Sequence, residues 1–452
     1  MAQPTSESTI NPTTRKTLKL LIAGAGLAGL TAAYVLASRG HHVLLYDARR
    51  SAPSTGGGIM IRPNGSRLFT AWGLGSYFAP ICDESPSTAF YNLETGAGGE
   101  RRQAVDVSPW PDWGLNRRQA WNVLHEAATR VGVQIKWGTA IDGFMARGDG
   151  VRVRLHGARM EDVDLVLDAT GAHSKLRPAV LGIPRDQAAT CNPRIVQGTA
   201  YSVSVKAAQI ASHPDARNLL SETTLKVWMG GKDRYVVQRH HEKNGEVSLL
   251  CFISDDETQD MKGFWDEDGD IEHLRSLVRG RMAPALWACL ETADHCARWK
   301  FCEMPGLDHW VGKNGRIALL GDSAHAMIPN AAQGFTQIVE DIGVLDYLLH
   351  ERQPELPVTE VMRLWELIRI PRVNLVKDFA RWNTDAFTGT TPPSEWARNE
   401  QAKTVEVSLK NVKPDSQAKF RSGAFLKWVM DYDAVSEARR YVDARQASRP
   451  RL

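Results

Sequence analysis

The first fifty residues consist of continuous apolar runs separated by short polar or glycine-rich breaks. The run LKLLIAG, which starts at Leu18, is typical of a buried strand; GAGLAG then makes a turn, and LTAAYVLASRG predicts a helix that ends at Gly40. A second apolar run, HHVLLYDA over 41–48, fits a strand of a parallel sheet that is covered on both faces. The pattern predicts a strand–helix–strand unit, and its glycines argue against a membrane span over 18–37.

Further along the chain the pattern changes twice. A buried strand is predicted over 162–171, whereas short alternating runs with turn residues between them predict a mainly antiparallel sheet within 186–298. The segment 316–349 then returns to strand, loop and helix, and 355–388 and 420–447 have the pattern of helices. The sequence therefore predicts an α/β protein whose first unit is built from two separated segments.

Composition narrows the class of protein. The 452 residues suit two or three domains, and 43% apolar with 24% charged residues exclude a disordered chain, a collagen and a coiled coil. A net charge of +3 gives no sign of a nucleic-acid-binding polyelectrolyte. The six cysteines make no CxxC pair and no zinc spacing, so we interpret them as reduced thiols of a cytoplasmic protein that binds no metal. Residues 1–16 lack an apolar run and have the pattern of a disordered tail.

Three glycines in the first turn carry the first chemical signal. Gly24, Gly26 and Gly29 form a GxGxxG motif between a strand and a helix, and Asp47 ends the next strand. Such glycines permit a tight bend and close approach of the backbone to a pyrophosphate, which the helix N-terminus then faces. The acidic residue accepts hydrogen bonds from a ribose. The combination predicts a site for an ADP-containing dinucleotide and does not choose between NAD and FAD.

Later motifs carry a resemblance to a known family. The strand RIALLG leads into Gly321 and Asp322, Pro329 follows, and Gln333-Gly334 precedes a long helix. With GAGLAG, these motifs resemble the group A flavoprotein monooxygenases, the aromatic hydroxylases that include salicylate and p-hydroxybenzoate hydroxylases. Other matching segments between residues 18 and 385 are GGGI with Pro63-Asn64, Asn116-Arg117 and the helix after it, DLVLDATGAHSKLR, the block from Trp310 through GDSAHAMIP, and ELIRIPRVNLV.

The resemblance implies a fold and a cofactor. The fold is α/β: a Rossmann-like FAD-binding domain of the GR2 type, an inserted, mainly antiparallel β-sheet substrate domain and C-terminal helices. The expected parts are a disordered tail at 1–16, a discontinuous FAD-binding domain at 17–185 and 299–394, a substrate domain at 186–298 and a helical C-terminal extension at 395–452. The residues expected to hold non-covalent FAD are Gly24, Gly26, Leu27, Ala28, Gly29, Asp47, Ala48, Arg49, Gly58, Arg117, Asp322, Pro329, Gln333 and Gly334.

Three of these residues have specific implied roles. Asp322 bonds the ribityl or ribose hydroxyls of FAD, and the helix after Gly334 points its positive end at the flavin ring. Arg117 neutralises part of the pyrophosphate charge, with Arg118 as the rival.

The implied reaction is a hydroxylation. NADH or NADPH reduces the flavin, O2 converts it to a C4a-hydroperoxide, and one oxygen passes to an aromatic or heteroaromatic small molecule of secondary metabolism or aromatic catabolism. The expected state is a monomer or homodimer with no nucleic-acid partner and no membrane span. Substrate identity and the choice of nicotinamide stay open. The alternatives are a flavin oxidase or dehydrogenase on the same scaffold, without oxygen insertion, and a binding protein without turnover.

The sequence departs from the family at two places. Thr170-Gly171 stands where the family has Asp-Gly, so the nicotinamide step loses a charge. In the substrate sheet, RYVVQRHH offers Tyr235, Arg239 and His240 as candidate catalytic residues that hold a substrate anion or relay its proton. Strand alternation places Tyr235 and Arg239 on one face and His240 on the other.

Overall fold

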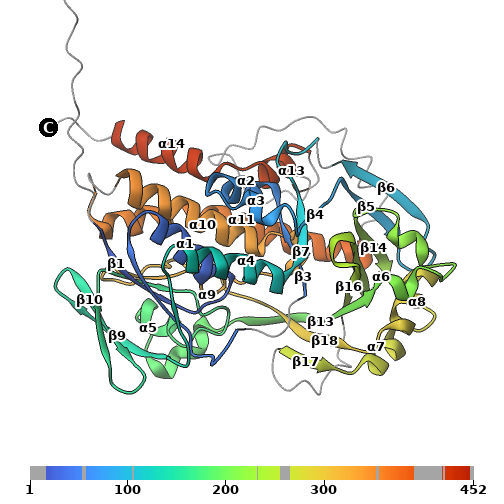
Figure 1. Cartoon of the computed structure of the whole chain (residues 1–452), viewed down its shortest axis with the longest axis horizontal. Coiled ribbons are helices and arrows are strands. Elements are labelled where there is room, and N and C mark those ends of the chain that lie inside the picture. The colour runs from blue at the N-terminus through green and yellow to red at the C-terminus, as the bar shows by residue number, and fades with distance from the viewer. Residues whose placement is uncertain are drawn as a thin grey trace, which may run out of the picture.

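The fold, a computed structural model, combines a parallel sheet, a larger antiparallel sheet and the helices that cover them. The structure describes residues 17–52, 57–103, 106–231, 233–254, 265–352, 356–390, 420 and 423–447. The tail expected at 1–16 and most of the extension expected at 395–452 lie outside the described residues. Figure 1 shows the N-terminal elements toward the left and the strands of the larger sheet toward the right.

The parallel sheet is the predicted strand–helix–strand unit, extended at both edges. Its strands are β1 (Lys19–Ala23), β2 (His42–Tyr46), β8 (Ile135–Lys136), β12 (Leu165–Asp168) and β19 (Ile317–Leu319). Their order is β19-β12-β1-β2-β8, and every pairing is parallel. A strand from beyond residue 300 thus completes a sheet that begins at residue 19.

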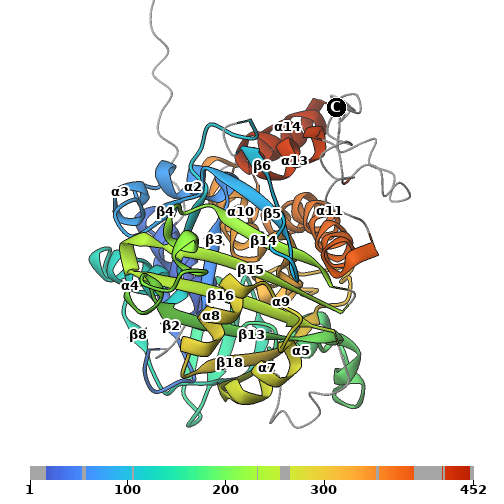
Figure 2. The same ribbon diagram turned by 90° about the vertical axis from the view of Figure 1, so that its right-hand side faces the viewer.

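The larger sheet has eight strands in the order β17-β18-β13-β16-β15-β14-β5-β6. Their bounds are β5 (Ser87–Asn92), β6 (Gly98–Gln103), β13 (Arg194–Lys206), β14 (Leu225–Gly231), β15 (Arg234–His241), β16 (Glu246–Ile253), β17 (Trp265–Gly269) and β18 (Cys296–Glu303). All pairings are antiparallel except that of β14 with β5. Figure 2 shows β13, β16, β15 and β14 crossing the molecule side by side.

Two strands of this sheet come from outside the segment 186–298. Both β5 and β6 belong to the stretch that the sequence assigned to the dinucleotide-binding part, and β5 joins the sheet edge by pairing with β14. The strand β6 reads GGERRQ, which has neither an apolar run nor a clean alternation, because most of its residues are exposed. The sequence therefore correctly predicted a mainly antiparallel sheet, but it did not predict the outer strands β5 and β6.

Two small sheets complete the strands. One orders β11 (Met160–Val163), β10 (Gly150–Leu155) and β9 (Ile141–Arg147), and the other orders β3 (Gly58–Ile61), β7 (Trp113–Asn116) and β4 (Asp83–Glu84). The second lies against the larger sheet, since a Cβ at Gly58 of β3 would lie 3.4 Å from Ser248 Oγ of β16. Gly58 pairs with Asn116, the residue before helix α4 (Arg117–Arg130).

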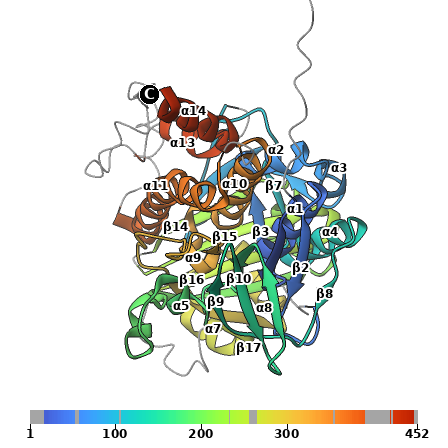
Figure 3. The same cartoon turned by 90° about the vertical axis from the view of Figure 1, so that its left-hand side faces the viewer.

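The helices cover both sheets. Besides α4 they are α1 (Leu27–Ser38), α2 (Pro63–Ala71), α3 (Gly75–Phe78), α5 (Arg177–Leu181), α6 (Ala207–Ile210), α7 (Ile271–Val278), α8 (Pro284–Thr292), α9 (Asp322–His325), α10 (Gly334–Tyr347), α11 (Val358–Asp385), α13 (Gly423–Met430) and α14 (Ala434–Ala447). Figure 3 shows α10 and α11 side by side with α13 and α14 above them. The helices predicted over 355–388 and 420–447 are confirmed within the described residues.

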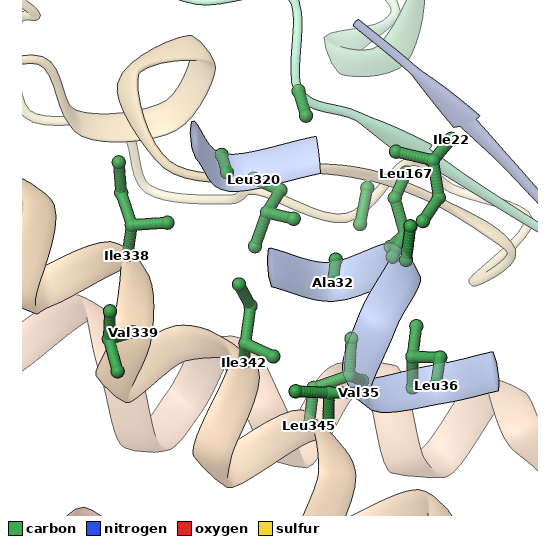
Figure 4. Close-up of a cluster of buried hydrophobic side chains, with 14 of the residues drawn as sticks. Ile22, Ala32, Val35, Leu36, Leu167, Leu320, Ile338, Val339, Ile342 and Leu345 are labelled. Carbon is green, nitrogen blue, oxygen red and sulfur yellow. The ribbon is translucent and has the colours of Figure 1, made fainter. Parts of the chain in front are cut away.

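A continuous apolar core joins the parallel sheet to α1 and α10. Ile22 of β1, Val35 of α1 and Ile342 of α10 are buried in one cluster, as Figure 4 shows. Burial of such side chains contributes about 1.5–3 kcal/mol each. This packing fixes the start of α10 next to the C-terminal edge of the parallel sheet, where β19 ends.

A buried ionic network fixes α10 on its other side. Arg369 of α11 donates to Glu340 over 2.7 Å and to Asp341 over 2.8 Å, and Arg372 donates to Glu340 over 2.9 Å. All four side chains are fully buried. Asn64 of α2 donates a further bond of 2.6 Å to Glu340. Because removing one partner of a buried pair leaves an uncompensated charge, these contacts hold α2, α10 and α11 in one geometry. Within the described part of the chain, no helix is long and apolar enough to cross a membrane.

Candidate functional site

The glycine turn between β1 and α1 has the geometry that its motif predicts. Gly24 has φ +96°, and a Cβ there would lie 2.6 Å from the carbonyl oxygen of Ala169; a Cβ at Gly29 would lie 1.8 Å from the carbonyl oxygen of Gly24. A Cβ at Gly26 would meet nothing within 4 Å. Gly24 and Gly29 are therefore required by the fold, whereas Gly26 leaves open space at the N-terminus of a twelve-residue helix. That space, with the helix dipole behind it, suits a phosphate.

Asp47 lies beside this turn. Its Oδ2 accepts a bond of 2.7 Å from the amide of Ala25, and Arg49 donates to both carboxylate oxygens. Although burial opposes it, the bonds from Arg49 hold the pKa of Asp47 below its usual value. An ionised acceptor thus stands at the end of β2. Ala48 and Arg49, which follow it, are exposed.

The second cluster of expected cofactor residues lies where β19 ends. Gly321 has φ +66°, and a Cβ there would lie 2.9 Å from Ile338 of α10, so the turn into α9 needs glycine. Asp322 begins α9, the short helical turn η4 (Pro329–Ala331) follows, and Gly334 begins α10. A Cβ at Gly334 would meet nothing within 4 Å. The N-terminus of a second buried helix therefore also has open space beside it.

One cavity of about 490 Å³ connects this cluster to the large sheet. The expected cofactor residues that line it are Leu27, Gly58, Arg117, Asp322, Pro329 and Gly334. Its other side is the face of the large sheet, which we call the sheet-side chamber, lined by Phe90, Val227, Val237, Arg239, His241 and Leu250. The expected residues that do not line the cavity are Gly24, Gly26, Ala28, Gly29, Asp47, Ala48, Arg49 and Gln333. All of these except Gln333 belong to the turn beside β1 and the end of β2.

The side chain of Gln333, another residue expected to hold FAD, lies in a buried network. Its side chain is fully buried and bonds to Asn64, Gln337 and the sulfur of Met430. The side chain therefore joins α2, α10 and α13 and is not among the groups that face the cavity. Its neighbour Gly334 lines the cavity instead.

The structure separates the two rival arginines at the start of α4. Arg117 lines the cavity, and its amide donates a bond of 2.9 Å to the carbonyl of Gly57. Arg118 lies over the ring of Trp121 at 5.8 Å and does not line the cavity. Asn116 caps the helix by accepting from the amide of Arg118, so the local sequence fixes which arginine turns inward.

The three catalytic candidates of β15 have different surroundings. Arg239 lines the cavity with 2% of its surface exposed, donates to the carbonyl of Asp83, and lies so close to Gly114 that a Cβ there would overlap it. Burial lowers the pKa of Arg239 to about 10, so it stays charged at neutral pH. The alternation prediction holds for His240, which does not line the cavity; burial lowers its pKa.

Tyr235 shares the face of Arg239 but does not line the cavity. It is fully buried, stacks on Phe252 at 4.8 Å and donates a bond of 2.5 Å to Asn330. Burial raises its pKa, so the phenol stays protonated. Asn330 does line the cavity, and Tyr235 thus acts on the cavity through that side chain.

Sequence reasoning missed His241. It lines the cavity, and its Nε2 lies 2.8 Å from Ser248 Oγ. Burial, and then the cation of Arg239, lower the pKa of His241 to about 3, so the ring is neutral. The alternation that placed Tyr235 and Arg239 on one face continues to residue 241, and that signal was sufficient to find it.

The end of the chamber beside Arg239 carries buried charge. Arg62 pairs with Asp112 over 3.1 Å, and burial raises the pKa of Asp112 although Arg62 and Arg239 oppose this. Both arginines line the cavity. Asp83, also buried, acts on Arg239 together with Asp112, so two guanidinium groups stand beside two carboxyls. The Arg239 cation in the cavity wall suits a ligand with an acidic or anionic edge.

The segment around Thr170, which departs from the family pattern, is held in place by hydrogen bonds to buried residues of the same chain. Asp168, fully buried, accepts from the amide of Thr170 at 3.0 Å and from its hydroxyl at 2.6 Å. The Thr170 hydroxyl is thus donated to Asp168. Arg177, also fully buried, donates to the carbonyls of Ala172 and Ser323, which ties this segment to the residue after Asp322.

The sequence of the chain is similar to sequences of known proteins. A family model described as an FAD binding domain matches residues 17–352. The chain is 25% identical over 440 residues to the FAD-dependent monooxygenase OpS4 of Beauveria bassiana (strain ARSEF 2860), covering 94% of this chain and 97% of that relative.

Two solved structures have a similar fold. One is CtdE in complex with FAD and substrate 4, with a TM-score of 0.77, 19% identity and coverage of 96% of this chain and 100% of that chain. The other is a salicylate hydroxylase substrate complex, with a TM-score of 0.73, 19% identity and coverage of 94% and 97%. At this identity the likeness concerns the fold, and it confirms the predicted α/β class with a mainly antiparallel second sheet.

Proposed function

The chain belongs to the FAD binding domain family, and on that basis we propose that it is an FAD-dependent monooxygenase that hydroxylates an aromatic or heteroaromatic small molecule of secondary metabolism, with NAD(P)H and O2 as co-substrates. The observation that carries the proposal is the single cavity that reaches from Asp322 and Gly334 to the sheet-side chamber. A cofactor held at the first end faces a ligand held at the second.

The residues present fit FAD. Gly26 and Gly334 leave open cradles at the N-termini of α1 and α10, which suit the pyrophosphate and the electron-rich edge of the flavin. Arg117 supplies a guanidinium, and Asp322 supplies acceptors for hydroxyl groups. When bound, FAD supplies the redox chemistry with NAD(P)H and O2.

The chain's own residues bind and orient the acceptor. Apolar side chains such as Val227, Val237 and Leu250 exclude water from the sheet-side chamber, and so protect the reaction from hydrolysis. Arg239 keeps its positive charge and holds the acidic edge of the substrate, and its charge stabilises the anionic form of a ring hydroxyl or N–H. Neutral His241 accepts or donates at Nε2, together with Ser248.

A visible spectrum of the purified protein tests the proposal first. We expect flavin bands that NADPH or NADH bleaches under anaerobic conditions, faster in the presence of an aromatic substrate. Asp322→Ala is expected to purify largely colourless, whereas Asp149→Ala, whose side chain is fully exposed, keeps its colour. Full retention of flavin in Asp322→Ala contradicts the assignment of that residue.

One observation supports a second candidate, a flavin oxidase. Thr170 replaces the acid of the family motif, and its hydroxyl is already donated to Asp168. If neither nicotinamide bleaches the flavin but a substrate alone does, the oxidase replaces the monooxygenase as the function.

A further inference from the structure

We propose that Met430, together with Leu426, forms the end wall of the sheet-side chamber and determines how long a ring system the enzyme accepts. The inference rests on the proposed function, because it specifies the size of substrate for the same cavity. Both residues belong to α13, in the C-terminal part of the chain.

Their position supports this role. Leu426 and Met430 are four residues apart on one face of α13, and both line the cavity with 4% and 8% of their surface exposed. They belong to the same buried cluster as Phe90 and Val227 of the sheet. A smaller hollow of about 40 Å³ lies beside the cavity, and the same two residues line it with Arg62 and Asp112. The wall thus separates the chamber from further space.

The sulfur of Met430 is fixed between two other elements. Arg62 Nε lies 3.3 Å from the sulfur, and Gln333 Nε2 lies 3.3 Å from it. Thioether sulfur is a weak acceptor, so these contacts orient the side chain more than they stabilise it. Since Gln333 immediately precedes Gly334, this contact also ties Met430 to the segment that leads into α10.

The helix behind the wall is held firmly. Arg372 of α11 donates a bond of 2.8 Å to the carbonyl of Val429, and Ser108 donates one of 2.8 Å to Asp431. A rigid apolar wall discriminates by size, and one methylene in a hydrophobic pocket changes selectivity by roughly 10-fold or more. Met430 is therefore the residue whose volume sets the length of the chamber.

Calorimetric titration of the purified holoprotein with benzoate, 2-naphthoate and anthracene-2-carboxylate tests the wall. These probes lengthen by one ring at a time, and their common carboxylate leaves ring length as the variable. We expect Met430→Ala to raise the affinity ratio of the three-ring to the one-ring probe by about tenfold, and Met430→Phe to lower it similarly. Met160→Ala, which changes a half-exposed methionine on β11, leaves the ratio unchanged.

Unchanged ratios in both Met430 variants overturn the inference, as does failure of the wild-type protein to bind any of the three probes. If Met430→Ala does not fold, Leu426→Ala is tested in its place. The same increase in the affinity ratio of the three-ring to the one-ring probe is expected. Failure of the proposed function has a different signature: the ratios shift as expected, but no substrate-dependent oxidation of NAD(P)H occurs. Substrate-dependent turnover with unshifted ratios overturns the wall alone.

Discussion

The guanidinium carbon of Arg372 lies 4.0 Å from the centre of the Tyr432 ring. The same group lies 4.2 Å from the centre of the Trp428 ring, and the two rings meet edge to face. Arg372 also donates to Glu340 of α10 over 2.9 Å. One buried cation therefore joins α10, α11 and the segment that carries α13, so the cofactor side of the cavity and its end wall share a single support.

Arg372→Met is expected to lower the free energy of unfolding by about 3–5 kcal/mol, because it leaves Glu340 with one fewer buried cation and removes the contact with both rings. Urea denaturation of the purified protein measures the change. Arg440→Met is the matched control, since Arg440 on α14 is mostly exposed and its surface pair with Glu437 contributes at most about 1 kcal/mol. Equal stability losses in the two variants would contradict the role of Arg372.

Alanine substitutions at two glycines of the first turn are expected to have different effects, one on folding and the other on flavin binding. Gly29→Ala places a Cβ against the carbonyl oxygen of Gly24, so the protein does not reach its native fold. Gly26→Ala has room for its Cβ and a backbone that alanine adopts, with φ −80°, so it folds, but the methyl occupies the space for the pyrophosphate. The ratio of flavin absorbance to protein absorbance is expected to fall about tenfold or more in Gly26→Ala. A folded Gly26→Ala variant with a full complement of flavin would show that the phosphate lies elsewhere.

His241 gives the protein a stability that depends on pH. Its pKa in the fold is about 3, whereas an unfolded histidine takes up a proton near pH ~6.5. Between these values the unfolded chain binds more protons, so the free energy of unfolding falls as the pH drops from about 6.5. His241→Gln is expected to flatten this part of the curve, measured as the urea midpoint at about pH 7 and about pH 5. His156→Gln, at a mostly exposed histidine, is expected to leave the slope unchanged; an unaltered slope in His241→Gln contradicts the assignment.

The parts of the fold that the sequence predicted are those that local patterns determine. The strand, turn and helix around Gly26 follow from apolar runs and from glycines at positions where the backbone leaves no room for a side chain. The outer strands β5 and β6 could not be predicted. An exposed edge strand such as β6 needs no apolar pattern, and β14, the strand through which β5 joins the sheet, lies far along the chain. Only tertiary pairing defines them.

The same distinction applies to the site. Residues next to a recognisable motif, such as Arg117 and Asp322, reach the cavity because backbone geometry carries them there. Gln333 belongs to such a motif, but its side chain turns into a buried network with Asn64 and Met430, which no local pattern reveals. The wall residue Met430 comes from a helix whose apolar positions indicate burial without indicating what they bury against.

Arg239 is expected to contribute to substrate use and not to cofactor binding. It lies on β15 in the sheet-side chamber, whereas the expected flavin contacts lie at Gly26, Asp322 and Gly334. Arg239→Met removes a hydrogen bond to a charged group, which corresponds to about 1.5–3 kcal/mol, so kcat/KM for a hydroxylated substrate is expected to fall roughly tenfold to a hundredfold with flavin content unchanged.

Tyr235→Phe serves as the comparison for Arg239→Met. It removes only the bond of Tyr235 to Asn330, and a neutral hydrogen bond corresponds to about 0.5–1.5 kcal/mol, so kcat/KM is expected to fall by roughly tenfold at most. Arg239→Lys keeps a positive charge and is expected to recover part of the activity that Arg239→Met loses, because the charge rather than the packing is what the substrate requires. If Arg239→Met keeps full kcat/KM, or if it loses flavin, then Arg239 supports the fold between β7 and β15 and does not hold the substrate.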